Sequence, residues 1–199
     1  MLKDFPEAVL LLKKHIEVFS KITACDWELL VPHLEMRSLK KNEFFIREGK
    51  RASDIGFVLE GMLRQYYTKD GEEKTTYFFF ENHFISSYIS CITTQPSLIT
   101  IEALSNVTYI SFPYDLLLTL FEASMAWQRF GRMIAEYLGI GLEERMVSLL
   151  IETPEERYIN LLRSNKKKII ERIPQHYIAN YLGITPVSMS RIRKRILKK

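Results

Sequence analysis

The sequence has little of what disulfide frameworks, metal centres and membrane spans require. It contains two cysteines without CxxC spacing, which excludes a disulfide framework, a thiolate metal site and an iron–sulfur cluster with four cysteine ligands. Four scattered histidines provide no ligand set, so we predict no metal and no other cofactor. No segment approaches the roughly 20 apolar residues of a membrane helix, and the charged N-terminal segment predicts a cytoplasmic protein without membrane contact.

Cations are missing from one long central part of the chain. Between Thr75 and Gln128 there is no lysine or arginine. A phosphate diester that leaves water needs a cation or a cluster of backbone donors to replace its hydration. This region therefore supplies no side-chain cation for a phosphate-containing ligand.

The charges that are present are distributed unevenly. From Arg157 to Lys199 there are 12 basic residues and one acid, Glu171, whereas the preceding residues carry 16 basic and 23 acidic side chains. The C-terminal part thus has a net charge of +11 and the rest of the chain −7. This split predicts two functional regions, of which the basic one contacts a polyanion.

The hydrophobic pattern predicts helices, then strands, then helices again. Up to about residue 34 the apolar spacing favours two short helices, the second capped by Thr23. From Glu35 to Phe112, runs rich in β-branched and aromatic residues alternate with glycine-containing turns, and Asp70-Gly71 is a strong hairpin signal. We therefore expect a closed or rolled antiparallel sheet.

A long helical stretch is expected after Pro113, and its apolar surface is wider than one contact within a subunit needs. We predict dimerisation along it, with burial inside a single subunit as the alternative. Gly131, Gly139 and Gly141 either permit close helix contact or mark a kink. The residues assigned to the dimer helix are Trp127, Phe130, Ile134, Tyr137 and Leu138.

The run Glu152-Thr153-Pro154-Glu155-Glu156 is a strong helix start, with a capping threonine, a proline in the first turn and acids at the positive end of the helix dipole. We expect this helix to end near Asn165, before a short extended piece at residues 169–173. The predicted domains are a sensor domain at 1–125, a long helix and hinge at 126–152, and a DNA-binding domain at 153–199.

The segment YIANYLGITPVSMSRIRK, near the C-terminal end, combines the features of a helix-turn-helix. Ala179 is small enough for two helices to cross closely, and Gly183 can adopt the left-handed conformation of the turn. Thr185 then caps a second helix that begins with Pro186. Several independent requirements coincide here, although a helical pair that only packs, with a solvated basic face, is the alternative.

The second helix of this motif carries the residues that we assign to DNA recognition. Its small N-terminal end fits a major groove, and an arginine can make a bidentate contact with guanine. We predict base reading by Val187, Ser188, Ser190 and Arg191. Phosphate contacts are assigned to Thr185, Arg193, Lys194, Arg195, Lys198 and Lys199.

Nearly the whole sequence resembles the Crp/Fnr family of bacterial transcription regulators, especially its Bacteroidetes-type members. The resemblance is carried by Gly49, Gly61 and Asp70-Gly71 between the strands, by ETPEERY, and above all by YIANYLGITPVSMSRIRK. The implied fold is α+β: an antiparallel β-roll (a double-stranded β-helix) with flanking helices, a long dimerisation helix and a C-terminal helix-turn-helix domain.

The resemblance also implies how such a protein works. A homodimer would bind a near-palindromic site on double-stranded DNA, with half-sites about 34 Å apart, and RNA polymerase is a further candidate partner. Arg191 matches a base-reading arginine of the family, whereas Pro186 and Val187 replace an arginine and a glutamate, so we expect a different target sequence. The family's β-hairpin wing is expected to be truncated, with Lys198 and Lys199 as partial replacements.

The cyclic-nucleotide pocket of the family is altered in this sequence. Family members that bind cyclic nucleotides use a Gly-Glu pair and an Arg-Ser or Arg-Thr pair, which align here with Ser86-Ser87 and Ser97-Leu98. Together with the missing cations, this predicts no binding of cyclic AMP, and the effector is unknown. The pocket either takes an apolar ligand or is vestigial; its candidate residues are Phe84, Ile85, Ser86, Ser87, Tyr88, Ser97, Leu98, Ile99 and Ile101.

Two other functions compete with that of a sequence-specific regulator. A cupin-like metal enzyme would need several histidine and carboxylate ligands on the strands, where His83 is the one histidine, so we predict that the protein is not an enzyme. A sensor or scaffold would bind a protein through its β-roll and nucleic acid nonspecifically through its basic tail. Such a protein would show steep salt dependence without sequence preference.

Overall fold

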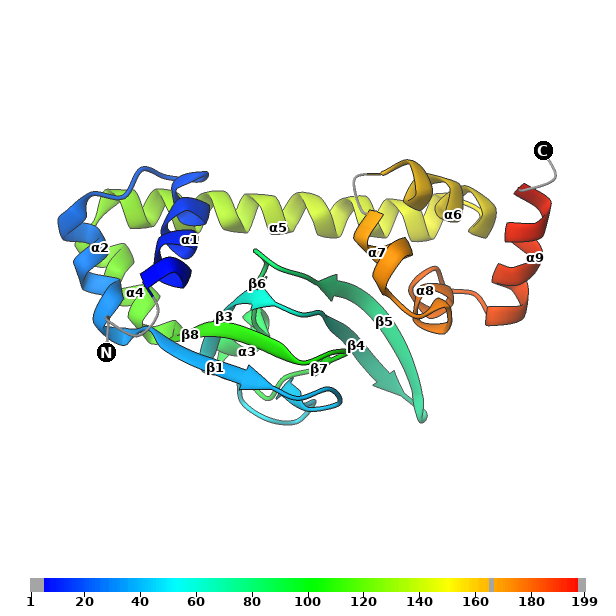
Figure 1. Ribbon diagram of the computed structural model, residues 1–199, viewed down its shortest axis with the longest axis horizontal. Coiled ribbons are helices and arrows are strands. Elements are labelled where there is room, and N and C mark those ends of the chain that lie inside the picture. Colours follow the sequence, from blue (N-terminus) through cyan, green and yellow to red (C-terminus); the bar gives the residue numbers. More distant parts are fainter. Residues whose placement is uncertain (1–5, 165–166, 197–199) are drawn as a thin grey trace.

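The computed structural model describes residues 6–164 and 167–196. A long helix runs along one side of the molecule, the β-roll lies beside it, and shorter helices gather near its two ends (Figure 1). Among the described residues, no helix is both long and apolar enough to cross a membrane.

Two four-stranded antiparallel sheets form the β-roll, with strand orders β1-β8-β3-β6 and β2-β7-β4-β5. This arrangement confirms the predicted α+β fold class. A short helix, α3 (Tyr88–Thr93), lies between β6 and β7 in the chain. The strands are β1 (Glu35–Leu39), β2 (Phe44–Ile46), β3 (Asp54–Glu60), β4 (Leu63–Lys69), β5 (Glu72–Phe79), β6 (Phe84–Ile85), β7 (Thr100–Ala103) and β8 (Val107–Pro113).

Apolar side chains fill the interior of the β-roll. Successive residues of a strand point to opposite faces, so inward residues of several strands meet in one cluster, where Val58, Ile85 and Ile101 have no exposed surface. Between β4 and β5, Asp70 and Gly71 have φ angles of 54° and 78°. Two consecutive positive φ angles are typical of a type I′ turn, so the predicted hairpin is confirmed.

The N-terminal helices and the end of the β-roll surround the start of the long helix α5 (Met125–Ile151). The N-terminal helices are α1 (Pro6–Glu17), α2 (Ala24–Leu30) and the short 3-10 helix η1 (Val31–His33). Helix α4 (Tyr114–Ala123), which follows the last strand, packs in the same cluster. The predicted cap of α2 is present, because Thr23 and Asp26 bond to each other's backbone N–H in a capping box.

The helical stretch expected after Pro113 consists of two helices rather than one. Ser124 has an extended backbone (φ −149°, ψ 130°), and its Oγ accepts a hydrogen bond from the N–H of Ala126 at 3.2 Å. The chain therefore turns at this cap, and α5 packs against α4. A Cβ on Gly131 would lie 2.6 Å from the ring of Phe121, so this glycine permits the close contact between the two helices.

The C-terminal part is a group of short helices: α6 (Pro154–Arg163), α7 (Lys167–Arg172), α8 (Gln175–Tyr181) and α9 (Pro186–Ile196). The predicted start of α6 is confirmed by a capping box between Thr153 and Glu156. The expectation of an extended piece at residues 169–173 is wrong, since residues 169–172 belong to α7 and the N–H of Ile173 donates to the carbonyl of Ile169 at 3.1 Å. Ile169 and Ile173 are 6% and 4% exposed, and a helical spacing of four places both on one buried face. The division into domains at these boundaries stays a prediction.

Candidate nucleic-acid interface

The helix-turn-helix is formed by α8, a glycine turn and α9. Gly183 has a φ of 73°, its N–H donates to the carbonyl of Asn180 at 3.0 Å, and the N–H of Ile184 donates to the carbonyl of Ala179 at 3.0 Å. This pair of bonds is a Schellman motif, which satisfies the carbonyls at the end of α8. The predicted left-handed turn at Gly183 is therefore confirmed.

Helix α9 is fixed by its cap and by its apolar face. The Oγ1 of Thr185 accepts a hydrogen bond from the N–H of Ser188 at 3.2 Å, as predicted for the capping residue. Met189 and Ile192 are 3% and 5% exposed, and they pack in one cluster with Ala179, which has no exposed surface. One side of α9 is thus locked against α8.

The opposite side of α9 is open to solvent. Val187 is 61% exposed, and Ser190, Arg191 and Lys194 are exposed as well. These four residues follow one another at steps of three, one and three, so they lie on a single face of the helix. Such a face combines a methyl group, a hydroxyl and two cations, which is what contact with base edges and phosphates requires.

The structure separates the predicted base-reading residues into two groups. Val187, Ser190 and Arg191 share the open face, whereas Ser188 is half-buried and its Oγ accepts a hydrogen bond from Thr185 Oγ1 at 3.0 Å. Ser188 therefore belongs to the cap of α9. Lys194, which was predicted to contact phosphate, also lies on the open face. Its spacing of seven residues from Val187 could have indicated this from the sequence, because residues seven apart lie on the same side of a helix.

The predicted phosphate contacts are also in different environments. Thr185 and Lys194 are exposed, Arg193 is half-buried, and Arg195 forms an ion pair with Glu155 at 3.1 Å. Lys198 and Lys199 lie outside the described residues. Lys194 is therefore the exposed cation of this set that forms no ion pair within the described part of the chain, and Thr185 offers an exposed hydroxyl.

The residues assigned to the dimer helix divide along α5. Trp127 and Phe130 are 0% and 5% exposed and pack in the subunit's own core, and Ile134 is partly buried against the same core. Tyr137 and Leu138 are 59% and 39% exposed. The assignment of Trp127 and Phe130 to a dimer contact therefore needs revision, because side chains already enclosed within one subunit offer no surface to a second.

The residues of the candidate effector pocket lie in different environments. Ile85 and Ile99 belong to the interior cluster of the β-roll together with Ile101, and Leu98 is 66% exposed. Phe84 packs against Phe57, with ring centroids 5.2 Å apart.

The polar members of the candidate effector pocket are bonded within the protein. The Oγ atoms of Ser87 and Ser97 lie 2.8 Å apart, and Ser97 Oγ also donates to the carbonyl of Ile99 at 2.7 Å. Both serines are buried. Ser86 Oγ lies 3.3 Å from Cys91 Sγ, and Tyr88 packs edge-on against Tyr114.

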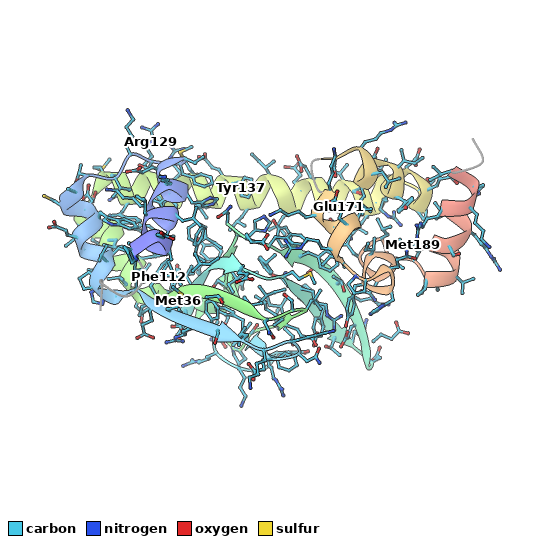
Figure 2. The ribbon with its side chains drawn as sticks, viewed as in Figure 1. Met36, Phe112, Arg129, Tyr137, Glu171 and Met189 are labelled. Atoms are coloured by element: carbon cyan, nitrogen blue, oxygen red, sulfur yellow. The ribbon has the colours of Figure 1, made fainter. Side chains whose placement is uncertain are left out.

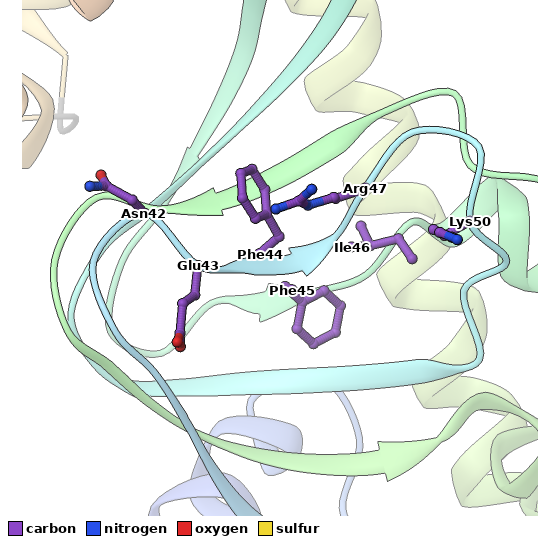
Figure 3. A pocket seen from close by; sticks show the side chains of 7 residues that line it. All are labelled: Asn42, Glu43, Phe44, Phe45, Ile46, Arg47 and Lys50. Atoms are coloured by element: carbon purple, nitrogen blue, oxygen red, sulfur yellow. The ribbon is translucent and has the colours of Figure 1, made fainter.

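Two hollows occur elsewhere on the surface. One, of about 420 Å³, follows β2 and the loop after it, where the guanidinium carbon of Arg47 lies 3.9 Å from the ring centroid of Phe44 (Figure 3). The other, of about 850 Å³, lies between the end of α1 and the start of α5. Arg129 lines this second hollow, and its side chain points away from the β-roll (Figure 2). Neither hollow includes a predicted effector residue.

Among the described residues, no group of three or more His, Cys, Asp or Glu side chains is placed to hold a metal ion. Burial lowers the pKa of His83 to about 4, and the nearby Lys168 acts in the same direction. His83 is therefore neutral at physiological pH and packs among the rings of Tyr77 and Phe80.

Comparison with known proteins agrees with this architecture. Residues 36–124 match the cyclic nucleotide-binding domain family. The transcriptional activator protein FnrA of Stutzerimonas stutzeri is 25% identical over 173 residues, which cover 80% of this chain and 69% of that protein. The transcriptional activator protein Anr of Pseudomonas protegens is 23% identical with the same coverage.

Solved structures show the same fold. FixK2 from Bradyrhizobium japonicum superposes with a TM-score of 0.70 at 19% identity, covering 83% of this chain and 85% of that one. A protein from Eubacterium rectale, described as a transcriptional regulator of the Crp/Fnr family, superposes with a TM-score of 0.69 at 18% identity, covering 88% and 84%.

Proposed function

Because the chain belongs to the Crp/Fnr family of transcriptional regulators, we propose that it regulates transcription as a homodimer that binds a specific, near-palindromic site on double-stranded DNA. The observation that carries this proposal is the open face of α9. Its three proposed base readers are Val187, Ser190 and Arg191, and Lys194 adds a cation on the same face. RNA polymerase is the proposed further partner, as expected of a transcriptional regulator.

The proposed dimer forms along the C-terminal part of α5. In this part of the helix, large apolar side chains are exposed on the surface of the subunit. They are Ile140, Leu142, Met146, Leu150 and Ile151, which are 55% to 76% exposed. Contiguous apolar surface of this kind marks an interaction site. A second copy that packs α5 against α5 would cover it and would place two α9 helices on one duplex.

The proposed sensor domain does not bind cyclic AMP. Its buried serines, Ser87 and Ser97, are hydrogen-bonded to each other, and no lysine or arginine lies between Thr75 and Gln128. A thermal melt with micromolar cyclic AMP should leave the melting temperature unchanged. A rise of several degrees that is lost in Ser97→Ala would contradict this part of the proposal.

Selection of duplexes from a random pool tests the DNA-binding proposal. We expect an enriched palindrome, and Arg191→Ala should lose discrimination at one base pair of each half-site by about 1 to 3 kcal/mol. Arg193→Ala is the control for discrimination: it removes the same charge from a half-buried position outside the open face, and loss of its predicted phosphate contact should weaken binding to all duplexes alike without changing base preference. Equal binding of all duplexes, with a steep salt dependence, would overturn the proposal and favour nonspecific binding.

A further inference from the structure

Helix α8 lies against the free edge of the β-roll. Strand β5 is the last strand of its sheet, so within residues 6–164 and 167–196 the backbone groups on its outer edge have no strand partner. The side-chain amide of Asn180 takes that place: its Oδ1 accepts a hydrogen bond from the N–H of Thr75 at 2.6 Å, and its Nδ2 donates to the carbonyl of Glu73 at 2.7 Å. Asn180 thus joins the helix-turn-helix to the sheet edge as a neighbouring strand would.

A buried arginine supports the same contact. The side chain of Arg64, on β4, is 5% exposed and forms ion pairs with Glu73 at 2.6 Å and Glu102 at 2.7 Å. Its guanidinium carbon lies 4.2 Å from the ring centroid of Tyr66 and 4.1 Å from that of Tyr177. Tyr177 belongs to α8, so the helix-turn-helix covers a cation that would otherwise face water on one side.

A second group of contacts joins the β-roll to α7 and α8. Glu81, which follows β5, pairs with Arg172 at 2.7 Å and with Lys168 at 2.9 Å. These hydrogen bonds, that of Arg172 first, lower the pKa of Glu81 to about 2, so both pairs persist through the neutral pH range. The rings of Phe78 and Tyr181 also meet, with centroids 5.5 Å apart.

The far end of α8 is held by the long helix and by α6. Arg145, on α5, donates to the carbonyl of Tyr181, and Arg157, on α6, donates to the carbonyl of Leu182 at 3.0 Å. Helix α8 is therefore fixed at two places, at its end by α5 and α6 and along its side by the sheet edge. Since α9 is locked to α8, both attachments together determine where α9 lies relative to α5.

We propose that Asn180, with the stacked pair of Arg64 and Tyr177, positions the recognition helix relative to the dimer helix and thereby sets the half-site spacing that the protein accepts. This inference rests on the proposed function. The contacts leave the open face of α9 uncovered, so they do not block DNA. A dimer that reads two half-sites needs its two recognition helices at a separation that matches the duplex. If α8 were held only by α5 and α6, without the sheet edge, α9 could move relative to α5, and the dimer would accept a wider range of half-site spacings.

Asn180→Ala tests the proposal, since it removes both hydrogen bonds while alanine is well tolerated in a helix. The first measurement is hydrogen exchange at the Thr75 amide, which should become about tenfold faster or more once its partner is lost. Asn160→Ala is the matched control. Asn160 lies on α6 and donates to Glu152 Oε1 at 2.8 Å, so this variant removes an amide from the same group of helices and leaves the sheet edge unchanged.

The second measurement uses the half-site selected by the wild-type protein, offered singly and in pairs whose separation differs by one to three base pairs. Asn180→Ala should bind the single half-site within about twofold of wild type, whereas its preference for the best spacing should fall about tenfold. Tyr177→Ala should act in the same direction, and Tyr177→Phe, which keeps the ring over Arg64, should behave as wild type.

Three outcomes would contradict the positioning role of Asn180. An unchanged spacing preference in Asn180→Ala, despite faster exchange at Thr75, would show that Asn180 is a structural tie without a positioning role. Loss of single half-site binding would mean that the substitution damages the helix-turn-helix itself, which also contradicts the inference. If the wild-type protein selects no half-site, the proposed function fails, and the positioning role fails with it.

Discussion

The two halves of α5 are parts of one continuous helix, yet they have opposite environments. In the first half, residues 125–138, Trp127 and Phe130 are 0% and 5% exposed. In the second half, residues 139–151, Leu150 and Ile151 are both 76% exposed. The two halves are similarly apolar in sequence. The pattern of hydrophobic residues therefore indicates an apolar face on each half, but it does not distinguish burial within the subunit from burial against a partner. The first half belongs to the subunit core, and the second is the surface through which we propose that a second copy binds.

Most of the exposed apolar residues near the second half form two stripes, and Met146 and Leu150 lie between them. Tyr137, Ile140, Val147 and Ile151 follow at steps of three, seven and four, and Leu138, Leu142 and Leu149 at steps of four and seven. Ile140 and Leu142 lie about 200° apart around the helix. A two-fold contact between two α5 helices has one seam, so the two stripes provide separate variants with which to locate it.

The largest expected effect on stability is in the first half of α5, which is buried in the subunit core. Trp127→Ala should lower the free energy of unfolding by about 3 to 5 kcal/mol, because the ring is fully buried and its loss leaves a cavity. It also removes the donor to the carbonyl of Asp26, which lies 3.1 Å from Nε1. Urea titration measures the change. Met125→Ala, two residues away and 78% exposed, is the control and should change it by less than about 0.5 kcal/mol. Similar losses in both variants would contradict the division of α5.

Charged substitutions in the second, exposed half of α5 should weaken dimerisation and leave the stability of the subunit fold unchanged. Ile140→Glu and Leu142→Glu each place a charge on one stripe, and we expect one of them to weaken the dimer by about a hundredfold or more, since a charge would be buried in the seam. The other should have a smaller effect. Sedimentation measures the dimer, and circular dichroism should show that both variants keep the subunit fold. A wild-type protein that stays monomeric at high micromolar concentration would overturn the dimer itself.

Local signals were sufficient to predict much of this molecule. Asp70-Gly71 defined a hairpin, Thr23 and Thr153 defined helix starts, and Gly183 defined the turn of the helix-turn-helix, because each of these features depends on neighbouring residues. The base-reading set stays a prediction, and the structure adds only that Val187, Ser190 and Arg191 share an exposed face. Ser188 was assigned to DNA because its hydroxyl can bond a phosphate or a base edge; in the structure this hydroxyl accepts a hydrogen bond from Thr185 Oγ1.

Features that depend on distant contacts could not be predicted. Asn180 and Thr75 are 105 residues apart in the sequence, and a lone asparagine on a helix carries no sign of the strand edge that it meets. Arg64 likewise shows no pattern that distinguishes a buried ion-paired arginine from a solvated one. The burial of Trp127 within the subunit depends on α2 and the β-roll, which the periodicity of α5 does not contain.

The smallest expected effect compares the glycines of the two halves. Gly131→Ala should destabilise the subunit by about 1 kcal/mol, because the new methyl group would meet the ring of Phe121 at 2.6 Å. In the single subunit, obtained in the Ile140→Glu or Leu142→Glu variant that dissociates the dimer, Gly139→Ala should stabilise the fold by about 0.5 to 1 kcal/mol, since nothing within the subunit lies within 4 Å and alanine favours the helix. Thermal melts measure both, and the same sign for the two variants would contradict the contrast between the halves.

Measuring Gly139→Ala in the dimeric protein as well as in the dissociated variant extends this test. In the monomer the alanine gains helix propensity alone. If the second copy approaches α5 closely at Gly139, the same methyl group meets the partner helix, and the stabilisation seen in the monomer reverses in the dimer. A stabilisation of equal size in both states would place Gly139 outside the seam, because helix propensity acts on the subunit regardless of its partner.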